Sequence, residues 1–158
     1  MSASKLQLAR YLGELTVYLR NLGAILPEPA IDPYDSGEIG FAFEATLPGP
    51  DKPKPALIAV GEIWSPVGHE SYERAEYRYE LIEYPLNRRR AFHMHDTDAF
   101  RRRADALVHE HCEEVLGHPT CDHYFGLPFN SGYDALNALL SLWGQPGPMG
   151  CSRLRCMG

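Results

Sequence analysis

The apolar side chains near the N-terminus recur every three or four residues, which places them on one face of a helix. The positions are Leu8, Tyr11, Leu12, Leu15, Tyr18, Leu19 and Leu22. Gly23 and Pro27 follow this run, and both residue types commonly end helices. The pattern therefore predicts an amphipathic N-terminal helix.

The middle of the chain changes to an alternation of apolar and polar residues, which is typical of strands with one buried face. The segments are EIGFAFEATLPG (38–49), ALIAVGEIW (56–64), ERAEYRYELIEY (73–84) and RRRAFHMH (88–95). The three residues PLN at 85–87 are short enough to join the last two segments as a hairpin. We therefore predict an antiparallel meander of about four strands.

The spacing of apolar residues returns to that of a helix after the last predicted strand. Asp96 or Thr97 can cap a helix that Gly117 and Pro119 would end. Its apolar face would comprise Phe100, Ala104, Leu107, Val108, His111 and Val115. A final helix is predicted over residues 131–143, where leucines and a tryptophan recur at helical spacing.

Together these elements predict an α+β protein, with an N-terminal helix, an antiparallel sheet and two C-terminal helices packed on that sheet. With 158 residues, the chain has the length of one domain. We assign residues 1–144 to a single α+β domain. Residues 145–158 show no periodicity and are predicted to form an irregular C-terminal tail.

The charge excludes one class of function and points to a local basic region. A net charge of −6 argues against a surface that coats nucleic acid non-specifically. Arginines nevertheless cluster at 88–90 and 101–103, directly after a run of glutamates. No continuous apolar segment begins the chain, so we expect neither a signal peptide nor a membrane span, and we expect the cytoplasm as its compartment.

His93 and His95 are the first candidates for chemistry. Alternate residues of a strand point to the same face roughly 6.5–7 Å apart, and a phosphate fits into that gap. One neutral imidazole could take a proton from a ribose 2′-hydroxyl while the other, protonated, donates one to the leaving oxygen. We expect Arg90 to assist catalysis and Arg89 and Arg101 to bind the phosphate, without any metal or cofactor.

The same two histidines allow other interpretations. They are either polar side chains on the solvent face of an edge strand, or two zinc ligands that need a third from elsewhere. His109 and His111 are expected on different sides of the predicted helix, so they are not expected to share an ion. The motifs of phosphate-cradling loops, dinucleotide-binding turns, nucleophile elbows and HExxH zinc proteases do not occur in the sequence.

A second group of histidines and cysteines lies in the last third of the chain. Cys112, His118, Cys121 and His123 supply enough ligands for a structural zinc ion, although their spacing matches no standard zinc finger. The alternative is a buried Cys112 beside loop histidines that bond to the backbone. Both alternatives stay open at this point.

The stretch YRYELIEYPLNRRRAFHMHD at 77–96 resembles the core segment of the TumE-type toxins of bacterial toxin–antitoxin pairs. The likeness consists of a tyrosine-rich strand, a hairpin and an arginine-bearing strand that ends in His-x-His. It implies a small cytoplasmic ribonuclease with an antitoxin as partner. The resemblance applies to five residues of this chain, which are Tyr77, Tyr79, Arg90, His93 and His95. The chain is longer than that pattern, its histidines run straight on from the hairpin strand, and its Cys/His-rich segment has no counterpart there.

Two hypotheses follow from the sequence. The first is a metal-independent ribonuclease that cleaves RNA with a pair of histidines, has an antitoxin or other protein as partner, and does not act on membranes. The alternative is a non-enzymatic module, stabilised by zinc, that binds a protein through its acidic strands. More broadly, the chain resembles uncharacterised actinobacterial proteins of unknown function, and that resemblance implies no activity.

Overall fold

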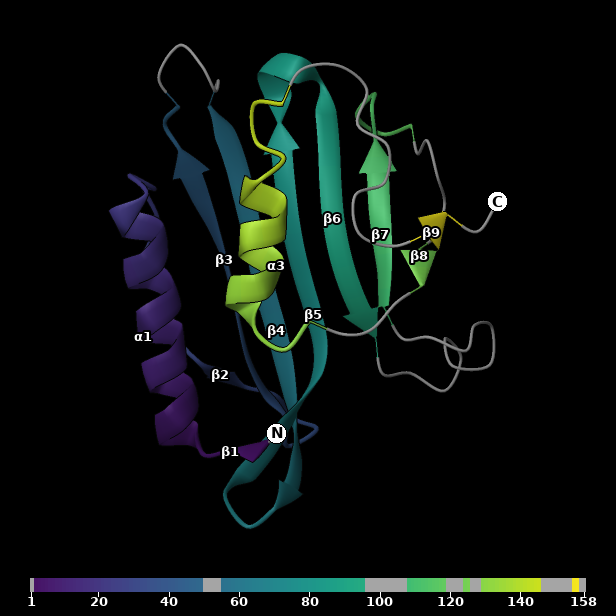
Figure 1. Ribbon diagram of the computed structural model, residues 1–158. Helices are drawn as coiled ribbons and strands as arrows, with labels where there is room; N and C mark the ends of the chain where they lie inside the picture. Colours follow the sequence, from purple (N-terminus) through teal and green to yellow (C-terminus); the bar gives the residue numbers. More distant parts are fainter. Residues whose placement is uncertain are drawn as a thin grey trace.

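A seven-stranded antiparallel sheet forms the centre of the molecule (Figure 1). The computed structural model describes residues 2–49, 55–95, 108–118, 124–125, 129–145 and 155–156. The elements are β1 (Ser2–Ala3), α1 (Lys5–Asn21), β2 (Asp32–Pro33), β3 (Ile39–Leu47), β4 (Ala56–Gly68), β5 (Ser71–Glu83), the 3₁₀ turn η1 (Tyr84–Leu86), β6 (Arg88–His95), β7 (Val108–Glu113), β8 (Tyr124–Phe125), α3 (Gly132–Leu140) and β9 (Arg155–Cys156).

The strands follow one another across the sheet in the order β2-β3-β4-β5-β6-β7. Strand β1 pairs with the first residues of β5, and β8 pairs with β9 in a separate two-stranded sheet. The long β4 and β5 lie at the middle, and η1 with a left-handed Asn87 turns the chain from β5 into β6. Each strand from β3 to β6 is therefore fixed in register by two neighbours.

Both described helices lie on the same face of the sheet (Figure 1). Ser4 caps α1 through a reciprocal capping box with Gln7, and Ser131 caps α3 by accepting a hydrogen bond from the Asp134 amide. The apolar stripes of the helices pack on aromatic residues of β3, β5 and β6. We call the face of the sheet on which the helices pack the core face. Among the described residues no helix covers the other face, which we call the open face.

The alternation of side chains assigns each residue of β5 and β6 to one of these faces. Tyr77, Tyr79 and Phe92 are fully buried on the core face. Their neighbours Arg78 and His93 stand opposite each other on the open face. Phe92 therefore anchors β6 in the core, and His93 lies on the side away from the helices.

The predicted four-stranded sheet with two C-terminal helices is wrong. The sheet has seven strands, and α3 is the one C-terminal helix among the described residues. Residues 108–113, predicted as part of a helix, form β7 instead, which pairs along β6 from Arg89 to Met94. Pairing with β6 supplies hydrogen-bond partners for the backbone N–H and C=O groups of this segment. This tertiary contact overrides the helical preference that the local spacing of apolar residues indicates. Residues 96–107, the rest of that predicted helix, lie outside the described part of the chain.

Other elements lie where the pattern predicts them. The N-terminal helix, the strands at β3 to β6 and the hairpin at 85–87 are present, and the final helix begins after Ser131. Within the predicted irregular tail, Arg155–Cys156 pairs with Tyr124–Phe125. The helices of the described part are too short or too polar to cross a membrane.

Truncating Phe92 to alanine should lower the free energy of unfolding by about 3–5 kcal/mol, because the ring is fully buried and its loss would leave a cavity. The ring lies 4.9 Å from that of Phe129, centroid to centroid, and so helps to hold the segment before α3. Urea denaturation measures the effect, with Tyr84→Ala as an exposed aromatic control. Equal midpoints for the two variants would show that the faces of β6 are assigned the wrong way round.

Candidate functional site

His93 and Glu80 form the centre of a polar cluster on the open face. His93 lies on β6 opposite Arg78, and Glu80 lies diagonally across on β5. The Nε2 atom of His93 is 3.0 Å from Oε1 of Glu80. About 13% of the His93 side chain is exposed, against 9% for Glu80. A partly exposed imidazole is thus held by a largely buried carboxylate.

Arg89 holds this carboxylate from the other side. Its Nε and one terminal nitrogen donate to the two oxygens of Glu80 at 3.1 and 2.9 Å, in a bidentate pair. The other terminal nitrogen donates to Glu113 at 2.8 Å. The alternation along β6 places Arg89 on the same face as His93. Its guanidinium faces two carboxylates, so it positions Glu80 within the cluster.

These contacts change the acidity of Glu80. Burial alone would raise its pKa, but hydrogen bonds from His93 and Arg89, together with the positive charge of Arg89 and that of His93 when it is protonated, outweigh burial and lower the pKa to about 2. Glu80 is therefore ionised at neutral pH. An ionised acceptor at this position favours the tautomer of neutral His93 that carries its proton on Nε2.

The second imidazole of the cluster is His111, from β7. Its ring centroid lies 4.6 Å from that of His93, with 54° between the ring planes. The prediction that His109 and His111 point to different sides assumed a helix, whereas this segment forms strand β7. In VHEHCE the charged Glu110 interrupts the alternation between Val108 and Cys112, so the segment carries no clear strand signal.

The structure does not bring Arg90 together with His93. Arg90 is adjacent to Arg89 on β6 and therefore points to the core face, where only 3% of it is exposed. It donates to Glu110 at 3.1 Å and to the Cys112 sulfur at 2.8 Å, both on β7. The sheet thus separates this guanidinium from a phosphate at His93.

Two other predicted residues fall at or beyond the limits of the described structure. His95 ends β6, where its backbone pairs with Glu76, and its side chain is outside the described part. Arg101 lies outside the described residues. Their predicted roles stay predictions.

The predicted zinc ligands are only partly described. Cys112 is buried on the core face of β7, and His118 is exposed in the turn after it. Cys121 and His123 lie outside the described residues. Within the described ranges no group of three or more histidines, cysteines and carboxylates is arranged to hold a metal ion. Zinc binding stays a prediction.

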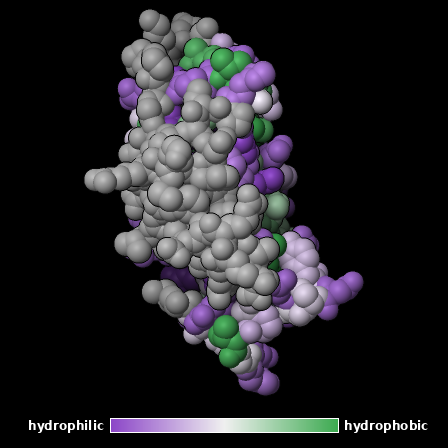
Figure 2. All heavy atoms as spheres, turned by 90° about the vertical axis from the view of Figure 1, so that its right-hand side faces the viewer, coloured by the Kyte–Doolittle hydropathy of each residue, from purple (hydrophilic) through white to green (hydrophobic). Residues whose placement is uncertain are grey.

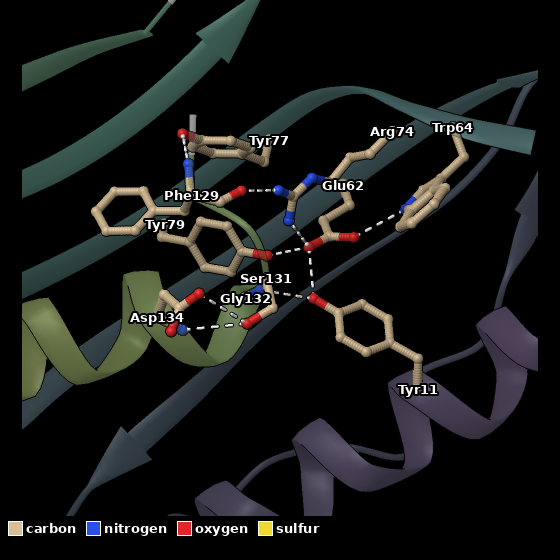
Figure 3. A network of polar contacts seen from close by, with 10 residues as sticks. All are labelled: Tyr11, Glu62, Trp64, Arg74, Tyr77, Tyr79, Phe129, Ser131, Gly132 and Asp134. Atoms are coloured by element: carbon tan, nitrogen blue, oxygen red, sulfur yellow. Dashed lines mark hydrogen bonds and ion pairs between the residues drawn. The ribbon is translucent and has the colours of Figure 1, made fainter. Parts of the chain in front are cut away.

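A second polar cluster lies on the core face around the buried Glu62 (Figure 3). One carboxylate oxygen accepts hydrogen bonds from the hydroxyls of Tyr11 on α1, at 2.8 Å, and of Tyr79 on β5. Arg74 donates to the same oxygen at 3.2 Å, and Trp64 donates to the other at 2.8 Å. Sequence reasoning missed this cluster, although a glutamate within the apolar run ALIAVGEIW was its signal.

The Glu62 cluster also anchors the start of α3. The Gly132 amide donates to the Tyr11 hydroxyl at 2.8 Å, and Arg74 donates to the carbonyl of Phe129 (Figure 3). Burial, and then the charge of Glu62, raise the pKa of Tyr11 and of Tyr79. Both phenols therefore stay protonated and can donate to the carboxylate. The cluster ties α1, α3 and the sheet together behind the open face.

The pKa of Glu80 predicts how stability depends on pH. A carboxyl whose pKa falls from 4.5 when unfolded to about 2 when folded stabilises the protein above pH 4.5, and this contribution is lost as the pH falls to 2. The full contribution is about 3 kcal/mol. Urea denaturation measures the unfolding free energies of wild type and Glu80→Gln between pH 6 and pH 2. The difference between the two proteins should shrink by about this amount as the pH is lowered. Parallel curves would contradict the assigned contacts of Glu80.

Comparisons of the chain with models of protein families, with curated proteins and with solved structures give no match.

Proposed function

We propose that the chain is a cytoplasmic ribonuclease that cleaves RNA without a metal, with His93 as the catalytic base. The observation that carries this proposal is the contact of His93 with ionised Glu80, with the His111 ring alongside. A histidine oriented by a carboxylate is the usual arrangement of a general base, and histidine titrates near neutral pH. Two imidazoles on one face supply the base and the acid that the reaction requires.

The proposed reaction moves two protons and exchanges one bond at phosphorus. With its Nε2 proton directed at Glu80, neutral His93 takes the ribose 2′-hydroxyl proton on Nδ1. The 2′-oxygen attacks phosphorus, and the bond from phosphorus to the 5′-oxygen breaks. Protonated His111 donates its proton to that leaving oxygen, which yields a 2′,3′-cyclic phosphate and a 5′-hydroxyl. His95, at the end of β6, is the other candidate for this acid.

Arg78 is the described cation best placed to contact the phosphate. It stands directly opposite His93 on β5, and 53% of its side chain is exposed. Its Nε atom is 3.8 Å from Glu80, a longer contact than those made by Arg89. A guanidinium here would offset the charge that develops on the phosphate oxygens. This role replaces the one that the sequence suggested for Arg90.

The side chains of the cluster are charged or polar, which supports a polar ligand. Figure 2 views the molecule from the side beside β7, where the described residues on view include hydrophilic ones and separate small groups of hydrophobic ones. The resemblance to TumE-type toxins supports the same reaction, and with it an antitoxin-like protein as natural inhibitor.

A digestion assay tests the proposal. Purified protein is incubated with an RNA oligonucleotide and the DNA oligonucleotide of the same sequence, with and without EDTA. The RNA should be cut equally with and without the chelator, and the DNA should stay intact because it lacks the 2′-hydroxyl nucleophile. If the wild type cuts neither, the non-enzymatic alternative replaces this proposal, and elemental analysis for zinc becomes the next measurement.

A further inference from the structure

A hollow of about 220 Å³ lies beside Arg78 on the open face. Its floor is low because Ala42 on β3 and Gly61 on β4 stand directly opposite each other, and both are small. The ring of Tyr34, from the turn between β2 and β3, forms part of the wall. A Cβ atom on Gly40 would lie 3.1 Å from that ring, so glycine lets the tyrosine lie close to the sheet.

The hollow is in register with His93. Arg78 pairs with His93 on one side and with Gly61 on the other, so two strand spacings separate the imidazole from the hollow. That separation is roughly 10 Å, since neighbouring strands lie about 4.8 Å apart. A nucleotide whose phosphate lies at His93 can therefore place its base in the hollow, with Arg78 between the two.

The size and walls of the hollow suit a single flat ring system. Its volume is below the roughly 300–1,000 Å³ of sites for drug-sized ligands. Tyr34 is an aromatic residue of the kind on which unpaired bases stack, and Ile63 adds an apolar wall. An RNA base is thus a better occupant than a larger ligand.

Glu76 bears on which base the hollow would hold. Its side chain lines the hollow next to Arg78, and a carboxylate only accepts hydrogen bonds. Guanine presents two adjacent donors, N1–H and the N2 amino group, on its Watson–Crick edge. Uracil presents one donor between two carbonyl oxygens. A carboxylate at this wall would therefore favour guanine, whose two donors it could accept as a pair of parallel hydrogen bonds.

We propose that this hollow is a subsite for guanine, and that it holds the base of the nucleotide whose 3′-phosphate is cleaved at His93. This inference rests on the proposed ribonuclease function, because it takes the position of the phosphate from that site. It assigns roles to three residues that the reaction itself does not use. Tyr34 stacks on the base, Glu76 pairs with its edge and Gly61 leaves the space that it occupies.

Two variants test the subsite. Gly61→Leu fills the hollow, and the added Cβ would meet its nearest neighbours at 3.7 and 3.8 Å, which are ordinary contact distances, so the variant should fold. Glu76→Gln keeps the shape but replaces one acceptor oxygen with a donor. Gly13→Leu is the matched control, since an added Cβ on that helical residue meets nothing within 4 Å.

The probes are guanosine 3′-monophosphate and uridine 3′-monophosphate, titrated by calorimetry, and circular dichroism checks each fold. Wild type and Gly13→Leu should bind the guanosine nucleotide about tenfold or more tightly than the uridine nucleotide. Gly61→Leu should lose at least about tenfold in affinity for the guanosine nucleotide, and Glu76→Gln should lose the preference. Equal binding of both nucleotides by wild type, or unchanged binding by Gly61→Leu, would overturn the subsite.

The binding assay also separates the two proposals. Guanosine nucleotide bound selectively by a protein that cuts no RNA would support the subsite and refute the ribonuclease. RNA cut by wild type and Gly61→Leu alike, without preference for guanosine on the 5′ side of the cut, would support the ribonuclease and refute the subsite.

Discussion

Replacing Glu62 with alanine should lower the free energy of unfolding by about 3–5 kcal/mol, the usual cost of removing one partner of a buried ion pair. The Glu62 side chain is fully buried, and its ion-pair partner Arg74 is only 12% exposed. The substitution would leave this guanidinium and the hydroxyls of Tyr11 and Tyr79 without their shared acceptor. Because these groups connect both helices to the sheet, the loss should appear as a lower midpoint of the whole unfolding transition in urea.

Controls show whether burial causes the effect. Glu44 lies one strand away on β3 and is exposed, so Glu44→Ala should change stability by less than about 0.5 kcal/mol. Glu62→Gln keeps an acceptor of the same shape but removes the charge, and its stability should fall between those of the two alanine variants. If Glu62→Ala is as stable as Glu44→Ala, the Glu62 cluster does not anchor the helices.

Changing His93 to asparagine should reduce RNA cleavage by about 10²–10⁴-fold, the usual contribution of a general acid or base. The fold should remain intact, because Arg89 still holds Glu80 through two hydrogen bonds. His111→Asn should cause a loss of the same order. Initial rates on a fluorescent RNA measure both, and the double variant should lose far less than the product of the two losses, since the groups act in one step.

His69→Asn is the matched control for this series. His69 is exposed in the turn between β4 and β5, so its loss should leave the rate within about twofold of wild type, in line with the small effect of most surface changes. A rate that His93→Asn and His111→Asn leave unchanged would remove both residues from the mechanism. His95→Asn then becomes the next variant, because the sequence predicts that residue as part of the pair.

Periodicity predicts those parts of the fold in which one face of an element is apolar. Leu8, Leu12, Leu15 and Leu19 meet this condition on α1, as do Tyr77 and Tyr79 on β5. Strand β7 does not have such an apolar face, because its core face carries the charged Glu110. This charge is stabilised by Arg90 on the neighbouring strand. Such a compensation depends on a partner twenty residues away in the chain, so the local pattern cannot reveal it.

The same distinction applies to the candidate site. Alternation along β6 is enough to place Arg89 and His93 together, and by the same rule it should have placed Arg90 on the other face. Glu80 and His111 join them only through the register of three strands. That register is set by the hairpin and by packing, and neither can be derived from the spacing of residues alone.

The most direct test of the account is the chemical nature of the ends that the protein leaves on RNA. The substrate is a short RNA with one preferred cleavage site, compared with the same RNA carrying a 2′-deoxyribose there, both in EDTA. Mass spectrometry of the products should show a 2′,3′-cyclic phosphate and a 5′-hydroxyl from the first, and no cut at that site in the second. A 3′-hydroxyl with a 5′-phosphate, or cleavage at the deoxyribose, would contradict a mechanism in which His93 activates the ribose hydroxyl.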